Sequence, residues 1–383
     1  MSAIPESEQP EYLITLVHGT FAHKAPWAWD YRSDFRSYLR ENLPGNVKFR
    51  CCAWSGRNRN RDRIHAAERL KKRLERQSRL YPNAKKIVIG HSHGGNVAIR
   101  AAAEFDSGRN LLAVVGMNTP WICATRRNTL QLSFFLGIFS FIALELWLLS
   151  RASLTTEQSS WWVQALSGLA VGAVLMLVAF LVIYKGSAVY KWMMGKREKL
   201  IKTLQPAPLH NTPVLCVWGG DDEVRNAFTV LEAVENIPFL LLHWVGLSVI
   251  AILIIAGIEM GYLPQLVDFV TKEMDGSFNV WMQDKFFVVA SATIYLTLTM
   301  YALILLIYVV NVVLRLLPVG VAVANFYHSA FVHLSFTLVP VTAKHTDFRE
   351  VDTNLNFLSH SSVYEDEKSL EEVCRWIIAR SKN

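Results

Sequence analysis

Residues 85–100 have the sequence KKIVIGHSHGGNVAIR, and this stretch decides the fold of the chain. The apolar run Ile87–Ile89 predicts a buried strand, and the residues from Asn96 onward are typical of a helix. Between them, GHSHG at residues 90–94 matches G-x-S-x-G, a sharp strand-to-helix turn that holds a serine hydroxyl above the sheet. The pattern alone is common by chance, so its interpretation depends on the predicted strand before it and the predicted helix after it. Ser92 is therefore a candidate nucleophile.

Short apolar runs rich in β-branched residues alternate with helical patterns along the rest of the chain. Six runs are expected to form strands: Tyr12–Val17, Val47–Ala53, Lys86–Ile89, Leu111–Met117, Pro213–Trp218 and Ser335–Val341. Helices are expected at Trp29–Glu41, Asp62–Leu80, Asn96–Glu104, Val224–Glu235 and Glu367–Ala379. Strands that alternate with helices imply βαβ units, and hence a mostly parallel, doubly wound sheet flanked by helices.

Four other apolar stretches approach or exceed the length that crosses a bilayer: Leu130–Ser150, Trp161–Tyr184, Ile237–Met260 and Phe286–Leu317. They predict two transmembrane hairpins in a multi-pass integral membrane protein. Lysines and arginines gather before the first span and after the second, so both ends of the chain and residues 185–236 are expected in the cytoplasm. Gly168 and Gly172 form G-x-x-x-G, which leaves open a homo-oligomer through these helices.

The charge balance is basic, with 39 lysines and arginines against 32 acidic residues. A net charge of +7 fits a face that lies against anionic lipid, and membrane lipids are the expected partners. The basic helix at 62–80 is interpreted as a solvated outer face or as a membrane contact. Nucleic-acid binding is not expected, because no known recognition module accompanies the charge.

Cysteine and histidine spacing gives no sign of a metal or a disulfide framework. The five cysteines contain no C-x-x-C pair and are interpreted as reduced thiols, which suits a cytosolic compartment. No cluster has metal-ligand spacing, and no glycine loop of the phosphate- or dinucleotide-binding type is present in the sequence. The chain is therefore expected to use no cofactor and no metal.

Three further motifs accompany the turn around Ser92: VHGT at 17–20, GGDDEV at 219–224 and SHSSVY at 359–364. Together they make the chain resemble the α/β-hydrolase superfamily of serine esterases and lipases, over about 12–117, 213–235 and 335–379. Candidate nucleophile, acid and base occur in the order Ser, Asp, His, which is the order of that superfamily. The resemblance implies an α/β-hydrolase fold and a serine-based triad.

Roles for the triad follow from this resemblance. Ser92 would attack the substrate, His360 would act as general base and then acid, and Asp222 would orient His360. Two alternatives stay open. Asp221 could replace Asp222, because adjacent residues point in opposite directions at a strand end. His345 could replace His360, because it directly follows the last predicted strand.

An oxyanion hole is also implied by the resemblance. Its first backbone N–H would come from His93, the residue after the nucleophile. Its second would come from Thr20 or Phe21 in the turn after the first strand, with Phe21 slightly preferred.

The chain is expected to divide into alternating soluble and membrane segments. Residues 1–11 form a flexible N-terminus, 12–128 the first part of the core, and 129–184 the first hairpin, where relatives commonly insert a lid. Residues 185–236 hold a basic juxtamembrane segment and the strand that carries the acid, 237–317 form the second hairpin, and 318–383 hold the histidine and the last helix.

These expectations describe a membrane serine hydrolase that cleaves carboxylic esters, with lipid or amphipathic substrates favoured by the position of the lid. Other classes stay open. A scaffold or binding protein could keep the fold with an inactive site, and a thioesterase, amidase or acyltransferase could use the same triad.

Overall fold

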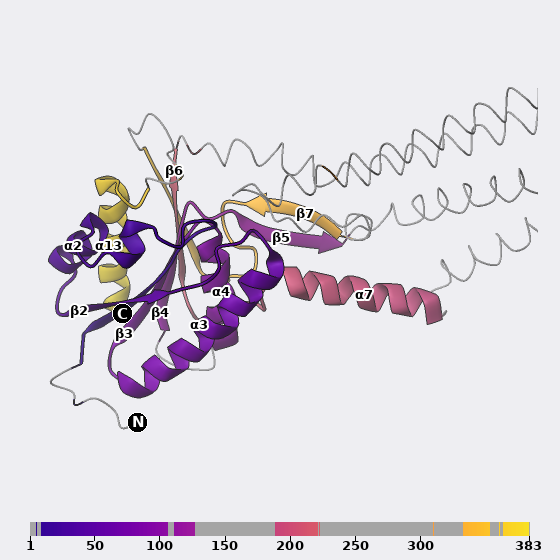
Figure 1. Cartoon of the computed structure of the whole chain (residues 1–383), viewed down its shortest axis with the longest axis horizontal. Coiled ribbons are helices and arrows are strands. Elements are labelled where there is room, and N and C mark those ends of the chain that lie inside the picture. The colour runs from indigo at the N-terminus through magenta and orange to yellow at the C-terminus, as the bar shows by residue number, and fades with distance from the viewer. Residues whose placement is uncertain are drawn as a thin grey trace, which may run out of the picture.

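A computed structural model of the chain describes residues 5, 9–105, 111–126, 188–220, 222, 309, 332–352, 360 and 363–382. Within these ranges, six parallel strands form one sheet in the order β2-β1-β3-β4-β6-β8 (Figure 1). These strands are β1 (Tyr12–Val17), β2 (Val47–Cys52), β3 (Lys85–His91), β4 (Leu111–Met117), β6 (Val214–Gly219) and β8 (Thr346–Val351). The mostly parallel α/β sheet predicted from the alternation of strands and helices is confirmed.

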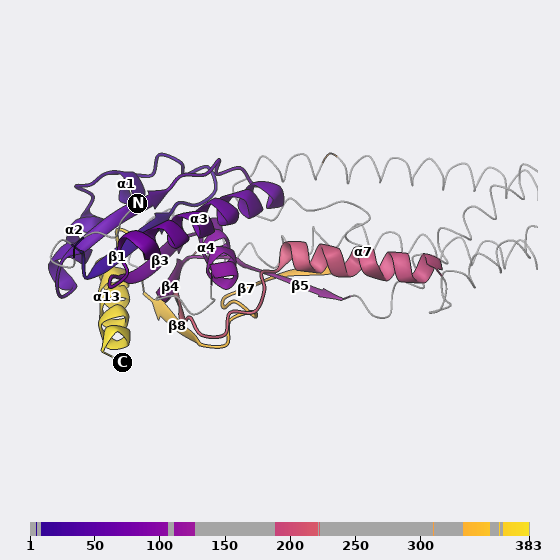
Figure 2. The same ribbon diagram turned by 90° about the horizontal axis from the view of Figure 1, so that it is seen from below.

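Helices cover both faces of this sheet (Figures 1 and 2). One face packs against α3 (Asn60–Leu80) and α4 (His93–Phe105), and the other against α1 (Pro26–Trp29), α2 (Asp34–Asn42) and α13 (Glu367–Ser381). Within β3, Ile87 and Ile89 join the α2 and α13 side while Val88 joins the α3 and α4 side. This alternation follows from the two-residue period of a strand. The consecutive apolar residues Ile87–Ile89 therefore bury both faces of the strand, as expected for a central parallel strand.

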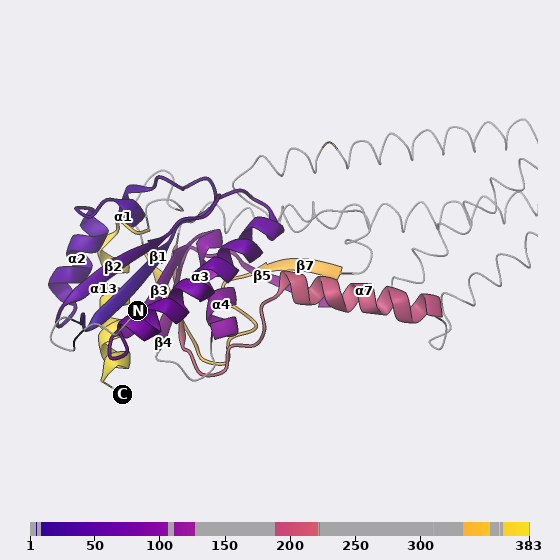
Figure 3. The ribbon, with the colours of Figure 1, turned by 60° about the horizontal axis from the view of Figure 1, so that its bottom comes forward.

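A two-stranded antiparallel ribbon extends from the sheet together with α7 (Ala188–Leu204), as Figure 3 shows. Its strands are β5 (Trp121–Arg126) and β7 (Val332–Thr337), and their register pairs Arg126 with Val332. Arg100 and Asn60 both donate to the carbonyl oxygen of Thr203, at 2.6 and 3.3 Å. Backbone carbonyls in the last turn of a helix have no hydrogen-bond donor within the helix. Arg100 and Asn60 supply such donors to Thr203. The C-terminal end of α7 is thereby attached to α3 and α4.

The last strand of the sheet differs from the prediction. The apolar run at 335–341 was expected to close the parallel sheet, but β7 pairs with β5 outside it, and the less apolar β8 takes the sheet position beside β6. Trp376 Nε1 and Arg380 both donate to Asp347 in β8, at 2.6 and 2.8 Å, which attaches this edge strand to α13. A polar edge strand held by side-chain contacts has little hydrophobic signal in the sequence.

The helix expected at 29–41 is also interrupted. The short helix α1 ends at Trp29 and α2 begins only at Asp34, so residues 30–33 are not helical. The Asp30 carboxylate accepts a hydrogen bond from the backbone N–H of Arg32 at 2.8 Å. Such an Asx turn competes with helical hydrogen bonding and ends α1.

Apart from residue 309, the four predicted membrane spans and the helix expected at 224–235 lie outside the described residues. Among the helices that the structure does describe, none combines the length and the apolar character needed to cross a bilayer.

Candidate active site

The turn between β3 and α4 places Ser92 at the carboxyl end of the central strand. Ser92 has a φ of +52°, a conformation that costs free energy for a residue with a side chain. Its backbone N–H donates to the carbonyl of Met117 at 2.9 Å, at the end of β4. The left-handed conformation is therefore held by a hydrogen bond to the neighbouring strand. Ser92 is 7% exposed, so its immediate surroundings are largely dry.

Glycines on both sides of Ser92 allow this turn. A methyl group at Gly90 would lie 2.5 Å from the backbone carbon of Gly94, which is closer than two carbons can approach. A methyl group at Gly94 would meet the backbone carbonyls of Val17 and His18 at the end of β1. Strand β3, helix α4 and the end of β1 thus approach more closely than any side chain would permit.

Asp222 and His360 are brought into contact although 138 positions separate them in the chain. His360 Nδ1 lies 2.9 Å from Oδ2 of Asp222 and 3.2 Å from its Oδ1. Asp222 is fully buried and the His360 side chain is 12% exposed. A carboxylate in this position fixes the tautomer with hydrogen on Nδ1 and leaves Nε2 as the proton acceptor.

Of the two alternative residues, Asp221 and His345, the structure describes only His345. Asp221 lies outside the described residues. His345 lies directly before β8, and its carbonyl accepts from the N–H of Val214 at the start of β6. All strands of the sheet are parallel, so His345 is at the amino edge, whereas Ser92 is at the carboxyl edge. His345 was expected directly after the last predicted strand, whereas in the structure it directly precedes β8 and lies at the opposite edge of the sheet from Ser92.

His91 attaches the segment that carries His360 to the turn around Ser92. Its Nε2 lies 2.7 Å from the carbonyl oxygen of His360, so Nε2 carries the proton and donates. The ring is enclosed by Trp27, Tyr364 and His360, with centroids 6.2, 5.1 and 5.1 Å away. Burial, together with the nearby His360, lowers the pKa of His91 to about 3. His91 is therefore a neutral positioning group rather than a base.

Asn118 was missed in the sequence and joins three parts of the site. It directly follows β4 with a φ of +44° and is fully buried. Its Oδ1 accepts from the N–H of Gly219 at 2.9 Å, and its Nδ2 donates to the carbonyl of His360 at 3.3 Å. The end of β6 and the His360 backbone are thus connected through one amide. A polar residue directly after a buried parallel strand was the available signal, because binding groups gather at carboxyl strand ends.

The turn after β1 lies against Ser92: a methyl group at Gly19 would approach the Cβ of Ser92 to 2.9 Å. In this turn the N–H of Phe21 donates to the carbonyl of Gly56 at 2.8 Å and is therefore occupied. No acceptor for the N–H of Thr20 is found among the described residues. The geometry thus favours Thr20 over Phe21 as the second donor to an oxyanion. His93 is the first residue of α4, where backbone N–H groups lack intrahelical acceptors.

Trp54 supports this turn and was also missed in the sequence. Its Nε1 donates to the carbonyl of His18 at 2.8 Å, and its backbone N–H lies 3.4 Å from His18 Nε2. The two rings stack with centroids 5.6 Å apart. Burial lowers the pKa of His18, which keeps this ring neutral and structural.

Metal binding finds no support in the part of the chain that the structure describes, since no group of three or more His, Cys, Asp or Glu side chains there could hold an ion.

Comparisons with solved structures give distant similarities. A Trichoderma reesei cutinase in complex with a phosphonate inhibitor is 19% identical, with 29% of this chain and 53% of the cutinase aligned and a TM-score of 0.23. A putative lipase from Acinetobacter baumannii is 14% identical over 58% of this chain and 70% of the lipase, with a TM-score of 0.25. The type II thioesterase BorB of the borrelidin biosynthetic cluster is 17% identical over 58% and 74%, with a TM-score of 0.27. The chain spans about half the length of the cutinase.

A search of curated proteins gave no match. The model of the alpha/beta hydrolase family matches residues 16–245, which is more than half of the chain and includes the Ser92 turn and Asp222. On this match, and with the parallel sheet described above, the chain belongs to the alpha/beta hydrolase family.

Proposed function

We propose that the protein is a serine hydrolase that cleaves carboxylic esters at the site around Ser92. In this mechanism His360 Nε2 accepts the Ser92 hydroxyl proton as the oxygen attacks the ester carbonyl. The buried Asp222 carboxylate stabilises the imidazolium that forms. The backbone N–H groups of His93 and Thr20 bind the oxyanion. His360 then returns the proton to the leaving alcohol, and water repeats the sequence to release the acid.

The observation that carries this proposal is the contact between Asp222 and His360 beside the strained turn. A buried carboxylate paired with a histidine is also common as a purely structural contact. Here, however, the carbonyl of His360 is held by His91, which directly precedes Ser92. That attachment supports a histidine positioned for the serine.

We further propose that the enzyme is held in a membrane and acts on lipid or amphipathic esters from the cytoplasmic side. The apolar stretches begin shortly after Arg126 and end shortly before Val332, and these two residues are paired neighbours in the β5–β7 ribbon. Beside the ribbon, α7 carries a Trp192 side chain that is 58% exposed, with Lys196 Nζ 5.7 Å from its ring. Exposed tryptophan and lysine are typical of a helix at the membrane interface. Both observations support membrane attachment on this side of the fold.

A fluorophosphonate probe tests the nucleophile on the full chain purified in detergent. Unmodified protein should be labelled, and Ser92→Ala should not. The matched control is Ser37→Ala, which removes a hydroxyl from α2, away from the site, and should be labelled like the unmodified protein. Absence of labelling in folded protein would contradict the serine mechanism.

The substrate class is tested with a panel of esters. Hydrolysis of a diacylglycerol in mixed micelles is compared with that of a short-chain nitrophenyl ester, with Ser92→Ala as the blank. The lipid proposal expects the larger kcat/KM for the diacylglycerol. Turnover of the soluble ester alone would reject the lipid substrate and leave the serine mechanism intact.

A further inference from the structure

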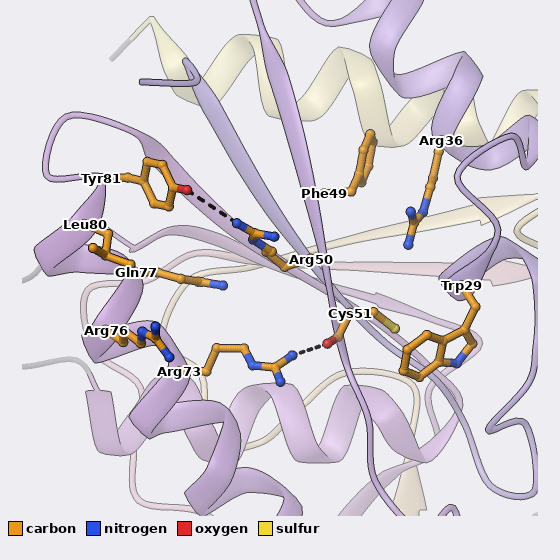
Figure 4. A pocket seen from close by; sticks show the side chains of 10 residues that line it. All are labelled: Trp29, Arg36, Phe49, Arg50, Cys51, Arg73, Arg76, Gln77, Leu80 and Tyr81. Atoms are coloured by element: carbon orange, nitrogen blue, oxygen red, sulfur yellow. Dashed lines mark hydrogen bonds between the residues drawn. The ribbon is translucent and has the colours of Figure 1, made fainter. Parts of the chain in front are cut away.

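A groove of about 550 Å³ runs along the free edge of β2, between α3 on one side and α1 and α2 on the other (Figure 4). Strand β2 is the first strand in the sheet order, so the described sheet has no neighbour along this edge. The groove lies outside the site around Ser92, because neither Ser92 nor His360 lines it. Its volume is in the range of pockets that hold small molecules.

Four arginines from three different elements line the groove: Arg36, Arg50, Arg73 and Arg76. None of the described residues that line it is acidic. Arg36, Arg50 and Arg73 form no ion pair with any carboxylate in the described part of the chain. The positive charges of these three arginines are therefore not paired with a described carboxylate, which favours an external anion.

Contacts within the protein already orient three of these guanidinium groups. Arg50 donates to the Tyr81 hydroxyl at 3.4 Å, and Arg73 donates to the carbonyl of Cys51, as the dashed lines in Figure 4 show. Arg36 lies over the ring of Phe49, with its guanidinium carbon 5.4 Å from the centroid. Arginines that are ordered before binding lose less conformational entropy when an anion binds.

Arg36 is a buried charged residue at the groove, with one donor that has no partner. Its side chain donates to the carbonyl of Ala28, but its buried Nε has no hydrogen-bond partner. Only 8% of Arg36 is exposed, and burial lowers the pKa of its guanidinium. A buried charged group without a full set of partners is costly. An anion in the groove would offset that cost.

We propose that this groove binds a phosphate-bearing ligand, either a phosphomonoester or a diphosphate. Guanidinium groups match phosphate oxygens in pairs of parallel hydrogen bonds, and several of them together suit a ligand with two or more negative charges. The phosphate could belong to a soluble metabolite or to a lipid headgroup, since both present the same chemistry.

Calorimetric titration of the full chain in detergent with pyrophosphate tests the site. The test variant is Arg50→Gln/Arg73→Gln, which removes two exposed guanidinium groups of the groove. The matched control is Lys72→Gln/Arg79→Gln, which removes two exposed charges from α3 outside the groove. We expect the test variant to bind about tenfold more weakly or worse, and the control within about twofold of the unmodified protein. Binding should also weaken as salt is raised.

Circular dichroism and the melting temperature establish that both variants are folded. No pyrophosphate binding by the folded protein, or equal weakening in test and control variants, would overturn the proposal. Binding of an acidic peptide in place of pyrophosphate would also overturn it, because β2 would then be an edge for strand addition.

The source of the phosphate is tested with glycerol 3-phosphate and with a short-chain phosphatidic acid below its micelle concentration. Equal affinity for the two would support a soluble ligand. A clear preference for the phosphatidic acid, lost in the test variant, would support a lipid headgroup.

Discussion

Nδ1 of His360 lies 2.9 Å from Oδ2 of Asp222, although 138 positions separate the two residues in the chain. The pair forms in a region where Asp222 is fully buried, so the carboxylate has little water to satisfy it. Its hydrogen bond to His360 therefore determines the tautomer of the ring. This contact is the basis of the first prediction.

Asp222→Asn should lower kcat for a short-chain ester by about 10³- to 10⁴-fold. An amide can donate to Nδ1, which favours the tautomer with hydrogen on Nε2, where the ring cannot accept the serine proton. Single-turnover kinetics measure the loss. His345→Ala is the control and should leave kcat within about twofold, because His345 lies at the amino edge of the sheet. Loss of activity in His345→Ala alone would assign the base to the other histidine.

Asn118→Gly should lower kcat by about 10- to 100-fold with little change in KM. Glycine accepts the φ of +44° at this position, so the variant removes the amide contacts to Gly219 and His360 without adding backbone strain. The melting temperature verifies that the protein is folded. A positioning role requires that the pH dependence of kcat/KM also changes, because the environment of His360 is altered. Unchanged kcat and pH profile would show that Asn118 is only a packing residue.

Trp54→Phe should lower kcat by about tenfold through the turn that holds Thr20. Phenylalanine keeps the stacking on His18 but cannot donate to its carbonyl, as Trp54 Nε1 does at 2.8 Å. The rate of acylation by the short-chain ester measures the effect. Trp29→Phe is the control, because that side chain is 43% exposed on α1 and should leave the rate unchanged. Equal rates for both variants would indicate that the turn needs no support from Trp54.

Lys86→Met should raise the free energy of unfolding at pH 7 by about 2 to 3 kcal/mol. Lys86 is fully buried, and burial lowers its pKa from 10.5 to about 8. Between these two values the unfolded chain holds a proton that the folded chain does not, so stability rises with pH across that window. The advantage of methionine should shrink as the pH rises from about 8 to 10.5, and it should be lost above that window, where lysine is neutral in both states.

Melting temperatures of the full chain and of Lys86→Met between pH 7 and 10.5 measure this difference. Titration of other side chains affects both proteins alike and cancels in the comparison. Two curves that stay parallel over the whole range would mean that Lys86 is not desolvated.

The local features of the site follow from short-range sequence patterns. The GHSHG stretch, with an apolar run before it, predicts a turn in which Ser92 is strained between two glycines. The uninterrupted apolar run Ile87–Ile89 in β3 predicts a strand buried on both faces. The structure describes both features as expected, because steric exclusion and hydrophobic burial act here over a few neighbouring residues.

Pairing between strands could not be predicted in the same way. Apolar runs indicate that residues form a strand but not which sheet that strand joins: β7 pairs with β5, and the position beside β6 belongs to β8, which was not expected as a strand. For the same reason His345 was expected directly after a strand, whereas it directly precedes β8. A strand partner is chosen by tertiary contacts such as those of Asp347 with Trp376 and Arg380, which the local pattern does not contain.

The sequence by itself determined the α/β class, the turn around Ser92 and a triad candidate in family order, because each depends on residues close together in the chain. Only the tertiary structure decided that His91 and Asn118 hold the His360 backbone and that the arginines of α3 face a groove beside β2. In the sequence these arginines belong to an ordinary charged helix. The edge strand and the aromatic residues that line the groove with these arginines come from distant segments of the chain. The free energy of their contacts depends on distance in space and not on separation along the chain.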